Sequence, residues 1–202
     1  MGTRHLISVV LDGEYKIAQY GQWDGYPSGQ GQAIVDFLLD NFDREAFKRQ
    51  LAKCRFLDRE GKDKAFVESY SANVPEWSSE PDKRTDEQKR WWKTYMSRDL
   101  GASILKAVAE SQDDEILLDD HSSFAGESLF CEWAYVIDLD KDVLEVYEGF
   151  QKQSVPAGER FAEMKPRDGD YYQVKHLKTF PIAELTAESM DGLERSEDED
   201  EE

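Results

Sequence analysis

The sequence predicts an α+β fold, with a largely antiparallel sheet and packed helices. Two observations predict it. β-rich segments occur in two hairpin-like pairs, and a long stretch with apolar residues at helical spacing separates the pairs. Strands and helices grouped in this way, without regular alternation, are typical of α+β domains. We expect one domain over residues 1–193, followed by an acidic, disordered tail over residues 194–202.

The first predicted element is a β-hairpin formed by residues 6–11 and 15–20, with Asp12 and Gly13 at its turn. An Asp-Gly pair favours the positive φ angles of a two-residue type I′ turn. Apolar side chains alternate onto both faces of the first strand. This strand is therefore expected to be central and covered on both sides.

Two helices are predicted next. Helical periodicity begins at Ile34, and Asp43 is the expected N-cap of the second helix. We expect Phe47, Leu51 and Cys54 on the buried face of that second helix, because their spacing places them on one stripe.

A third helix is predicted from the capping-box spacing of Thr85 and Gln88. Its apolar stripe is expected to run to about Glu110. Gly101 lies within this helix, where it either weakens the helix or marks the close approach of another segment.

The C-terminal part is predicted to contain a second hairpin, formed by residues 133–138 and 143–147. A further strand is expected over residues 171–178, and a short helix near residues 183–190. The order of elements is then hairpin, helices, hairpin, strand and helix, which supports the α+β prediction.

Composition excludes several classes of function. The formal net charge is −19, and a field of that sign repels phosphate backbones and anionic membranes. No segment is apolar over the length needed to span a bilayer, and the N-terminus does not have the pattern of a secretory signal. Cys54 and Cys131 are expected to be buried, reduced thiols. We expect a soluble cytoplasmic protein, with the nucleus left open, that binds neither nucleic acid nor membrane.

The most unusual segment is the loop over residues 19–31, where aromatic and polar side chains lie among four glycines. Glycines allow backbone amides to approach a ligand, and a helix begins directly after the loop. The lysine of a phosphate-binding loop is absent, so that class of nucleotide site is not predicted. The alternative interpretation is a tight corner between strand and helix that simply requires glycine.

Five sequence blocks resemble an uncharacterised protein family that occurs in phages, bacteria and fungi. They are GTRHL at residues 2–6, YGQWDGYPSGQG at 20–31, SRDLGASIL at 97–105, FCEWAYVIDLD at 130–140 and YEGF at 147–150. The resemblance covers roughly residues 2–150. It implies membership of a family without implying an activity.

The layout of the N-terminus is also similar to N-terminal-nucleophile amide hydrolases of the choloylglycine-hydrolase type. In that resemblance Arg4 and Asp24 match the family motif, and an N-terminal-nucleophile-hydrolase-like fold is implied. The nucleophile does not match, because Gly2 stands where the family has cysteine. Thr3 could replace it only if processing removed Gly2.

One four-residue pattern, aromatic–acid–glycine–aromatic, occurs at residues 23–26 and again at residues 147–150. Each copy follows a predicted hairpin. If the hairpins are neighbours, the two copies could line one pocket; the alternative is ordinary turn chemistry.

Three other candidates have a plainer interpretation. Arg98 could clamp a carboxylate or phosphate, or be a solvated helix charge. Residues 119–121, Asp-Asp-His, suggest metal ligands but are adjacent, so an acidic loop is favoured. Cys131 has acidic neighbours, which favours an inert thiol.

The leading prediction is a domain that binds a small molecule or a peptide through the loop over residues 19–31. The contacting residues would be Arg4, Gln22, Trp23, Asp24, Tyr26 and Arg98. The alternatives are an amide or ester hydrolase on an N-terminal-nucleophile-like scaffold, and an interaction module whose acidic tail binds a basic partner. No catalytic residue, metal or cofactor is assigned.

Overall fold

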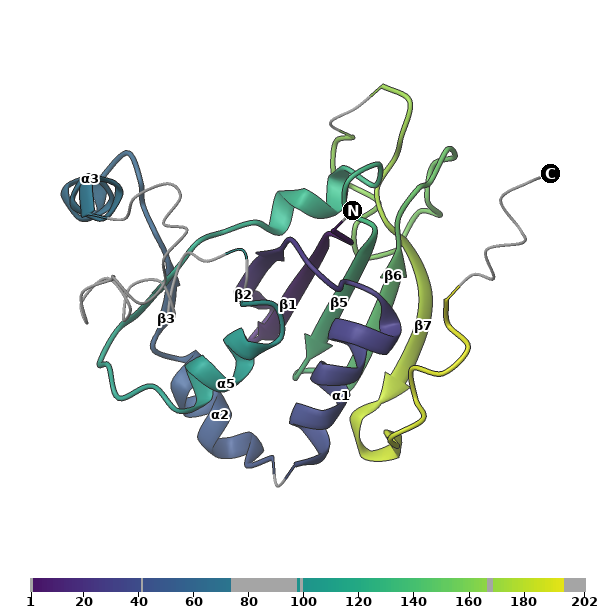
Figure 1. The fold of residues 1–202 in the computed structure, drawn as a ribbon, viewed down its shortest axis with the longest axis horizontal. Coiled ribbons are helices and arrows are strands. Elements are labelled where there is room, and N and C mark those ends of the chain that lie inside the picture. The colour runs from purple at the N-terminus through teal and green to yellow at the C-terminus, as the bar shows by residue number, and fades with distance from the viewer. Residues whose placement is uncertain (1, 41, 74–97, 99, 167–168, 195–202) are drawn as a thin grey trace.

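The centre of the structure is a five-stranded sheet with the strand order β2-β1-β5-β6-β7 (Figure 1). The computed structural model describes residues 2–40, 42–73, 98, 100–166 and 169–194. Neighbouring strands are antiparallel except β1 and β5, which are parallel. The α+β prediction is therefore confirmed. The strands are β1 (His5–Leu11), β2 (Glu14–Gly21), β5 (Trp133–Asp138), β6 (Val143–Glu148) and β7 (Lys175–Pro181).

Both predicted hairpins are present. Asp12 and Gly13 have φ angles of 57° and 74°, as a type I′ turn requires, and Leu11 pairs with Glu14 across it. The second hairpin joins β5 to β6. Parallel pairing of β1 with β5 places the two hairpins side by side, although they are more than a hundred residues apart in sequence.

Helices cover one face of the sheet (Figure 1). They are α1 (Gln32–Leu39), α2 (Arg44–Leu51) and α5 (Ser103–Ala109). Asp43 is the N-cap of α2, as predicted, because its carboxylate accepts a hydrogen bond from Ala46 N at 2.9 Å. Phe47 and Leu51 are the buried residues of α2. Cys54 was wrongly placed on this helix: the chain has already turned into strand β3 (Cys54–Phe56), where Cys54 is still buried.

Irregular segments cover the opposite face. The prediction that β1 is covered on both sides is confirmed, since all seven of its residues are buried. A second hydrophobic core lies on this face, opposite the core beneath the helices. It includes Leu6, Val10, Ala134 and Val136 packed against Ala125, Phe161 and Val174. Ion pairs also join this layer to the sheet. Arg160 pairs with Asp138 of β5 and donates a hydrogen bond to Glu145 of β6 at 2.6 Å.

The remaining predictions are corrected in part. Residues 85–97 lie outside the described residues, and the helix does not continue through Gly101, whose φ of +49° interrupts it before α5 begins. The strand predicted at residues 171–178 is β7, shifted toward the C-terminus. The prediction of a helix near residues 183–190 is wrong, because only a 3₁₀ turn at Ile182–Glu184 forms there.

Two strands and one α-helix of the described residues were not predicted. They are β3, the parallel strand β4 (Ile116–Leu118) that pairs with it, and helix α3 (Lys64–Asn73). Of the predicted tail, only Glu194 is described, and it accepts a hydrogen bond from Ser28 N at 2.9 Å. No helix within the described ranges is long and apolar enough to cross a bilayer.

Candidate functional site

The two copies of the aromatic–acid–glycine–aromatic pattern lie at the same end of the sheet. Strand β2 ends at Gly21 opposite His5, and β6 ends at Glu148 opposite Trp133. His5 and Trp133 are themselves paired, because β1 and β5 are parallel and in register. The chain segments that leave β2 and β6 therefore emerge at the same end of the sheet, with β1 and β5 between them.

Exposed aromatic side chains are concentrated at this end. Among the described residues, six large hydrophobic side chains are exposed, and four of them are here: Trp23 (52%), Tyr26 (45%), Phe130 (37%) and Phe150 (48%). We call these four residues together with Arg4 the aromatic end. Exposed apolar groups gathered in this way mark an interaction surface more often than single exposed residues do.

Arg4 brings a positive charge into the aromatic end. Its guanidinium carbon lies 4.6 Å from the centroid of the Phe130 ring, in a cation–π contact. Glu132 holds the residue in place, since its carboxylate accepts from Arg4 N at 3.1 Å and lies 3.7 Å from Arg4 Nε. The side chain is still about one-third exposed, so it can meet an anionic group of a ligand.

Gln22 and Arg98 adjoin Arg4 through Tyr20. The Tyr20 hydroxyl donates to Gln22 Oε1 at 2.6 Å, and Gln22 N donates to the Arg98 carbonyl at 2.9 Å. Burial raises the pKa of the Tyr20 phenol, and the charges of Arg4 and Arg98 oppose that rise. Three of the predicted site residues, Arg4, Gln22 and Arg98, thus lie around one tyrosine.

Asp24 is positioned differently from these three. It is exposed, with a φ of 58°, and its carbonyl accepts from Gln30 N at 2.9 Å. Its carboxyl group lies against Gly29, where an added Cβ would be 2.6 Å from Asp24 Cγ. The acid therefore shapes the start of the π-helical turn η1 (Pro27–Gly31) instead of facing Tyr20.

The glycines of the loop are explained by close packing. A Cβ at Gly25 would lie 2.7 Å from the Thr3 carbonyl, and a Cβ at Gly101 would collide with the side chain of Gln30. Gln30 Oε1 instead accepts from Ala102 N at 2.7 Å. The structural interpretation of the glycines and a functional role for the aromatic residues are thus both compatible with this loop.

His5 is a buried residue of this end that the sequence did not reveal. It is fully buried beneath Gly21 and Gly25, and burial lowers its pKa to about 4. The sequence contains no signal for this, because the contacts depend on the loop folding back over the first strand.

The other chemical candidates are structural. Asp119 forms a forked pair with Arg59, and His121 Nδ1 accepts from Tyr20 N at 3.4 Å. No group of three or more His, Cys, Asp or Glu that could hold a metal occurs among the described residues. Both cysteines are free and buried, as predicted; burial raises the pKa of Cys54 to about 12 and that of Cys131 well above its usual range.

No family model matches the chain, and no curated protein or solved structure shows significant similarity to it. Both resemblances drawn from the sequence therefore stay predictions. The hydrolase layout also meets a local obstacle at position 2. A Cβ there would lie 2.5 Å from the Gln22 carbonyl and 2.6 Å from Trp23 Cε3, so a nucleophilic side chain does not fit without movement of the loop.

Proposed function

We propose that this protein is a peptide-binding module, and that it recognises its partner through the aromatic end. The observation that carries the proposal is the gathering of four exposed aromatic side chains and Arg4 from two hairpins. Trp, Tyr and Arg are the residues that most often dominate the energy of protein interfaces. This end is an exposed rim, which suits an extended segment better than a small enclosed ligand.

The chemistry of the partner follows from the charges. Arg4 and Arg98 lie beside Tyr20, within a protein that is strongly acidic overall. A peptide with an acidic side chain next to an apolar one would place its carboxylate at Arg4 and its apolar group against Trp23. Four of the five blocks that resemble the phage, bacterial and fungal family contribute a residue to the aromatic end, namely Arg4, Trp23, Phe130 and Phe150. The remaining block contributes Arg98, which lies near Tyr20. The family resemblance thus supports a role for this surface.

Selection from a displayed random-peptide library against the full chain tests the proposal. We expect enriched sequences to combine Asp or Glu with an adjacent apolar residue, and their affinity to fall at least about tenfold in Trp23→Ala and in Arg4→Gln. Leu39→Ala and Leu177→Ala are matched controls, because they remove apolar side chains of similar exposure elsewhere. Binding that is unchanged by Trp23→Ala, or a selection without enrichment, would refute the proposal.

A substitution of Asp24 distinguishes a direct contact with the peptide from a role in the structure of the loop. Because Asp24 has a positive φ, alanine would strain the backbone, whereas asparagine tolerates this conformation. Asp24→Asn should therefore keep both the fold and the binding. If Asp24→Asn abolishes binding while the melting temperature is unchanged, the acid contacts the peptide directly, and the contact assigned to Arg4 must be revised.

A further inference from the structure

A cleft of about 700 Å³ lies on the helical face, between α1, α2 and α5. None of its lining residues belongs to the aromatic end, although Gln30, on one wall, is in the loop that carries Trp23 and Tyr26. Neither copy of the repeated four-residue pattern lines it. Its volume is within the range of sites that hold small organic molecules.

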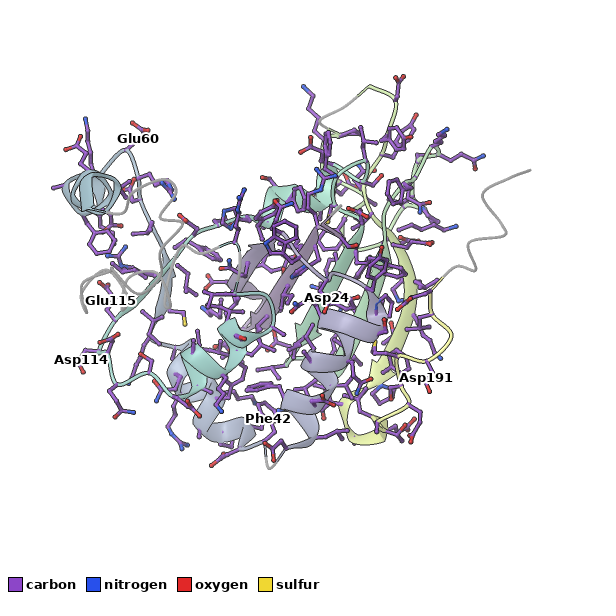
Figure 2. The ribbon with its side chains drawn as sticks, in the orientation of Figure 1. Asp24, Phe42, Glu60, Asp114, Glu115 and Asp191 are labelled. Carbon is purple, nitrogen blue, oxygen red and sulfur yellow. The ribbon has the colours of Figure 1, made fainter. Side chains whose placement is uncertain are left out.

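The floor of the cleft is aromatic. Phe37, Phe42 and Phe47 form a cluster in which every pair of rings is in contact, with centroids 5.4 to 5.6 Å apart. Phe42 lies between α1 and α2 (Figure 2). Phe47 is fully buried, whereas Phe37 and Phe42 are half-buried and reach the cleft surface. A flat apolar group could stack on these rings.

The rim of the cleft is acidic. Asp36, Asp40, Asp43 and Glu110 line it, against a single cation, Lys106, which is paired with Glu110 at 3.7 Å. Asp36 and Asp43 are held in place, since their carboxylates accept hydrogen bonds from Gln32 Nε2 at 2.8 Å and from Ala46 N at 2.9 Å respectively. Carboxylates above an aromatic floor favour a cation, and the negative field of the whole chain acts in the same direction.

We propose that this cleft binds a small organic cation: an ammonium group attached to an aromatic or alicyclic body. The apolar body lies on Phe37 and Phe42, and the ammonium group meets Asp36 and Asp40. The volume and the charge complementarity carry this assignment together. It is independent of the peptide site, since it shares neither the residues nor the ligand class of the aromatic end.

Titration of the full chain with three matched compounds tests the ligand class. 4-Phenylbutylamine supplies ring and cation, 4-phenylbutanol has the ring without the charge, and 4-phenylbutyrate carries the opposite charge. In amide chemical-shift titrations we expect the amine to bind at least about fivefold more tightly than the alcohol, and the acid not to bind. The shifts should map to α1, α2 and α5. Equal affinity for amine and alcohol would overturn the proposal.

Charge-matched variants test the site. Asp36→Asn with Asp40→Asn should weaken amine binding at least about fivefold. Glu60→Gln with Asp191→Asn removes the same charge from exposed positions outside the cleft and should leave the affinity unchanged (Figure 2). Asp43 is left intact because it caps α2. If both double variants weaken amine binding equally, the effect comes from the net charge of the whole protein, and the proposed site in the cleft is refuted. If a lysine-rich peptide shifts these helices and the amine does not, the small-molecule assignment is wrong.

Discussion

The two copies of the aromatic–acid–glycine–aromatic pattern use their glycine in the same way, but they differ in the exposure of their first aromatic residue. Gly25 N donates to the Thr3 carbonyl at 2.9 Å, and Gly149 N donates to the Glu132 carbonyl at 2.8 Å. Each glycine thus ties its segment to the start of the neighbouring hairpin strand. The first aromatic residue, however, is 52% exposed in one copy (Trp23) and 2% exposed in the other (Tyr147).

The difference arises from strand position and register. Strand β2 lies at an edge of the five-stranded sheet and ends before its copy begins, so Trp23 is carried beyond the sheet. Strand β6 is interior and includes Tyr147, which is covered by Phe161 with ring centroids 4.8 Å apart. One pattern therefore yields a recognition surface where the chain leaves the sheet and a core residue where the strand continues.

The largest expected effect separates the two aromatic residues. Tyr147→Ala should lower the free energy of unfolding by about 3–5 kcal/mol, because it empties a fully packed site. Trp23→Ala should change it by less than about 1 kcal/mol, because half of the side chain is already exposed. Urea denaturation of the two variants measures this. Similar losses in both would show that Trp23 is part of the core, and the comparison would fail.

The next effect concerns the residue beneath the first copy. His5 pairs with Trp133 across the sheet, but unlike Trp133 it can bind a proton. Its folded-state pKa of about 4 lies below the ordinary value of 6.5, so the unfolded chain binds the proton first as the pH falls. The free energy of unfolding should therefore be highest above pH 6.5 and fall by up to about 3 kcal/mol toward pH 4.

Urea denaturation as a function of pH measures this dependence. His5→Leu should flatten most of the slope between pH 6.5 and 4, whatever its effect on stability at neutral pH. A smaller slope should remain from His121, whose pKa is also lowered by burial. His176→Gln is the control, since His176 lies at a surface strand. A slope that persists in His5→Leu would assign the dependence to other groups.

Local features of this fold could be predicted from the sequence, and long-range ones could not. The turn at Asp12-Gly13 and the cap at Asp43 depend on neighbouring residues only, and both are confirmed. The parallel pairing of β1 with β5 and the strands β3 and β4 depend on contacts between distant segments. Gly101 illustrates both cases. A close approach at Gly101 was one of the predicted alternatives, but the residue that approaches it could not be predicted. That residue is Gln30, which accepts a hydrogen bond from Ala102 N, 72 residues away in sequence.

The residues of the candidate site divide in the same way, and their role in binding stays a prediction. The composition of the loop over residues 19–31 singled out Trp23 and Tyr26, and both are exposed. Sequence alone could not show that the carboxyl group of Asp24 turns toward Gly29 while Arg4 and Arg98 meet at Tyr20. The cleft on the helical face could not be foreseen either, because it is formed by the packing of three helices.

A third prediction tests what the two copies have in common. Gly25→Ala and Gly149→Ala should each lower the free energy of unfolding by about 2 kcal/mol, since an added methyl group meets the main chain just before β1 or β5. Gly169→Ala is the control, because a Cβ there meets nothing within 4 Å. Thermal and urea unfolding provide the measurement. If only one of the two variants is destabilised, the shared role of the glycine is wrong.

The smallest expected effect lies at the opposite end of the two hairpins, where their turns are joined. The carboxylate of Asp140, in the second turn, accepts from Asp12 N at 2.9 Å and from Gly13 N at 2.8 Å in the first. Because these hydrogen bonds are exposed, Asp140→Ala should cost about 1 kcal/mol. It should also speed hydrogen exchange of the Asp12 and Gly13 amides, whereas Asp114→Ala, which removes a charge from another exposed position, should do neither. Unchanged exchange at both amides would mean that strand pairing alone aligns the two hairpins. The hydrogen bonds between the turns would then not contribute to the arrangement of the aromatic end.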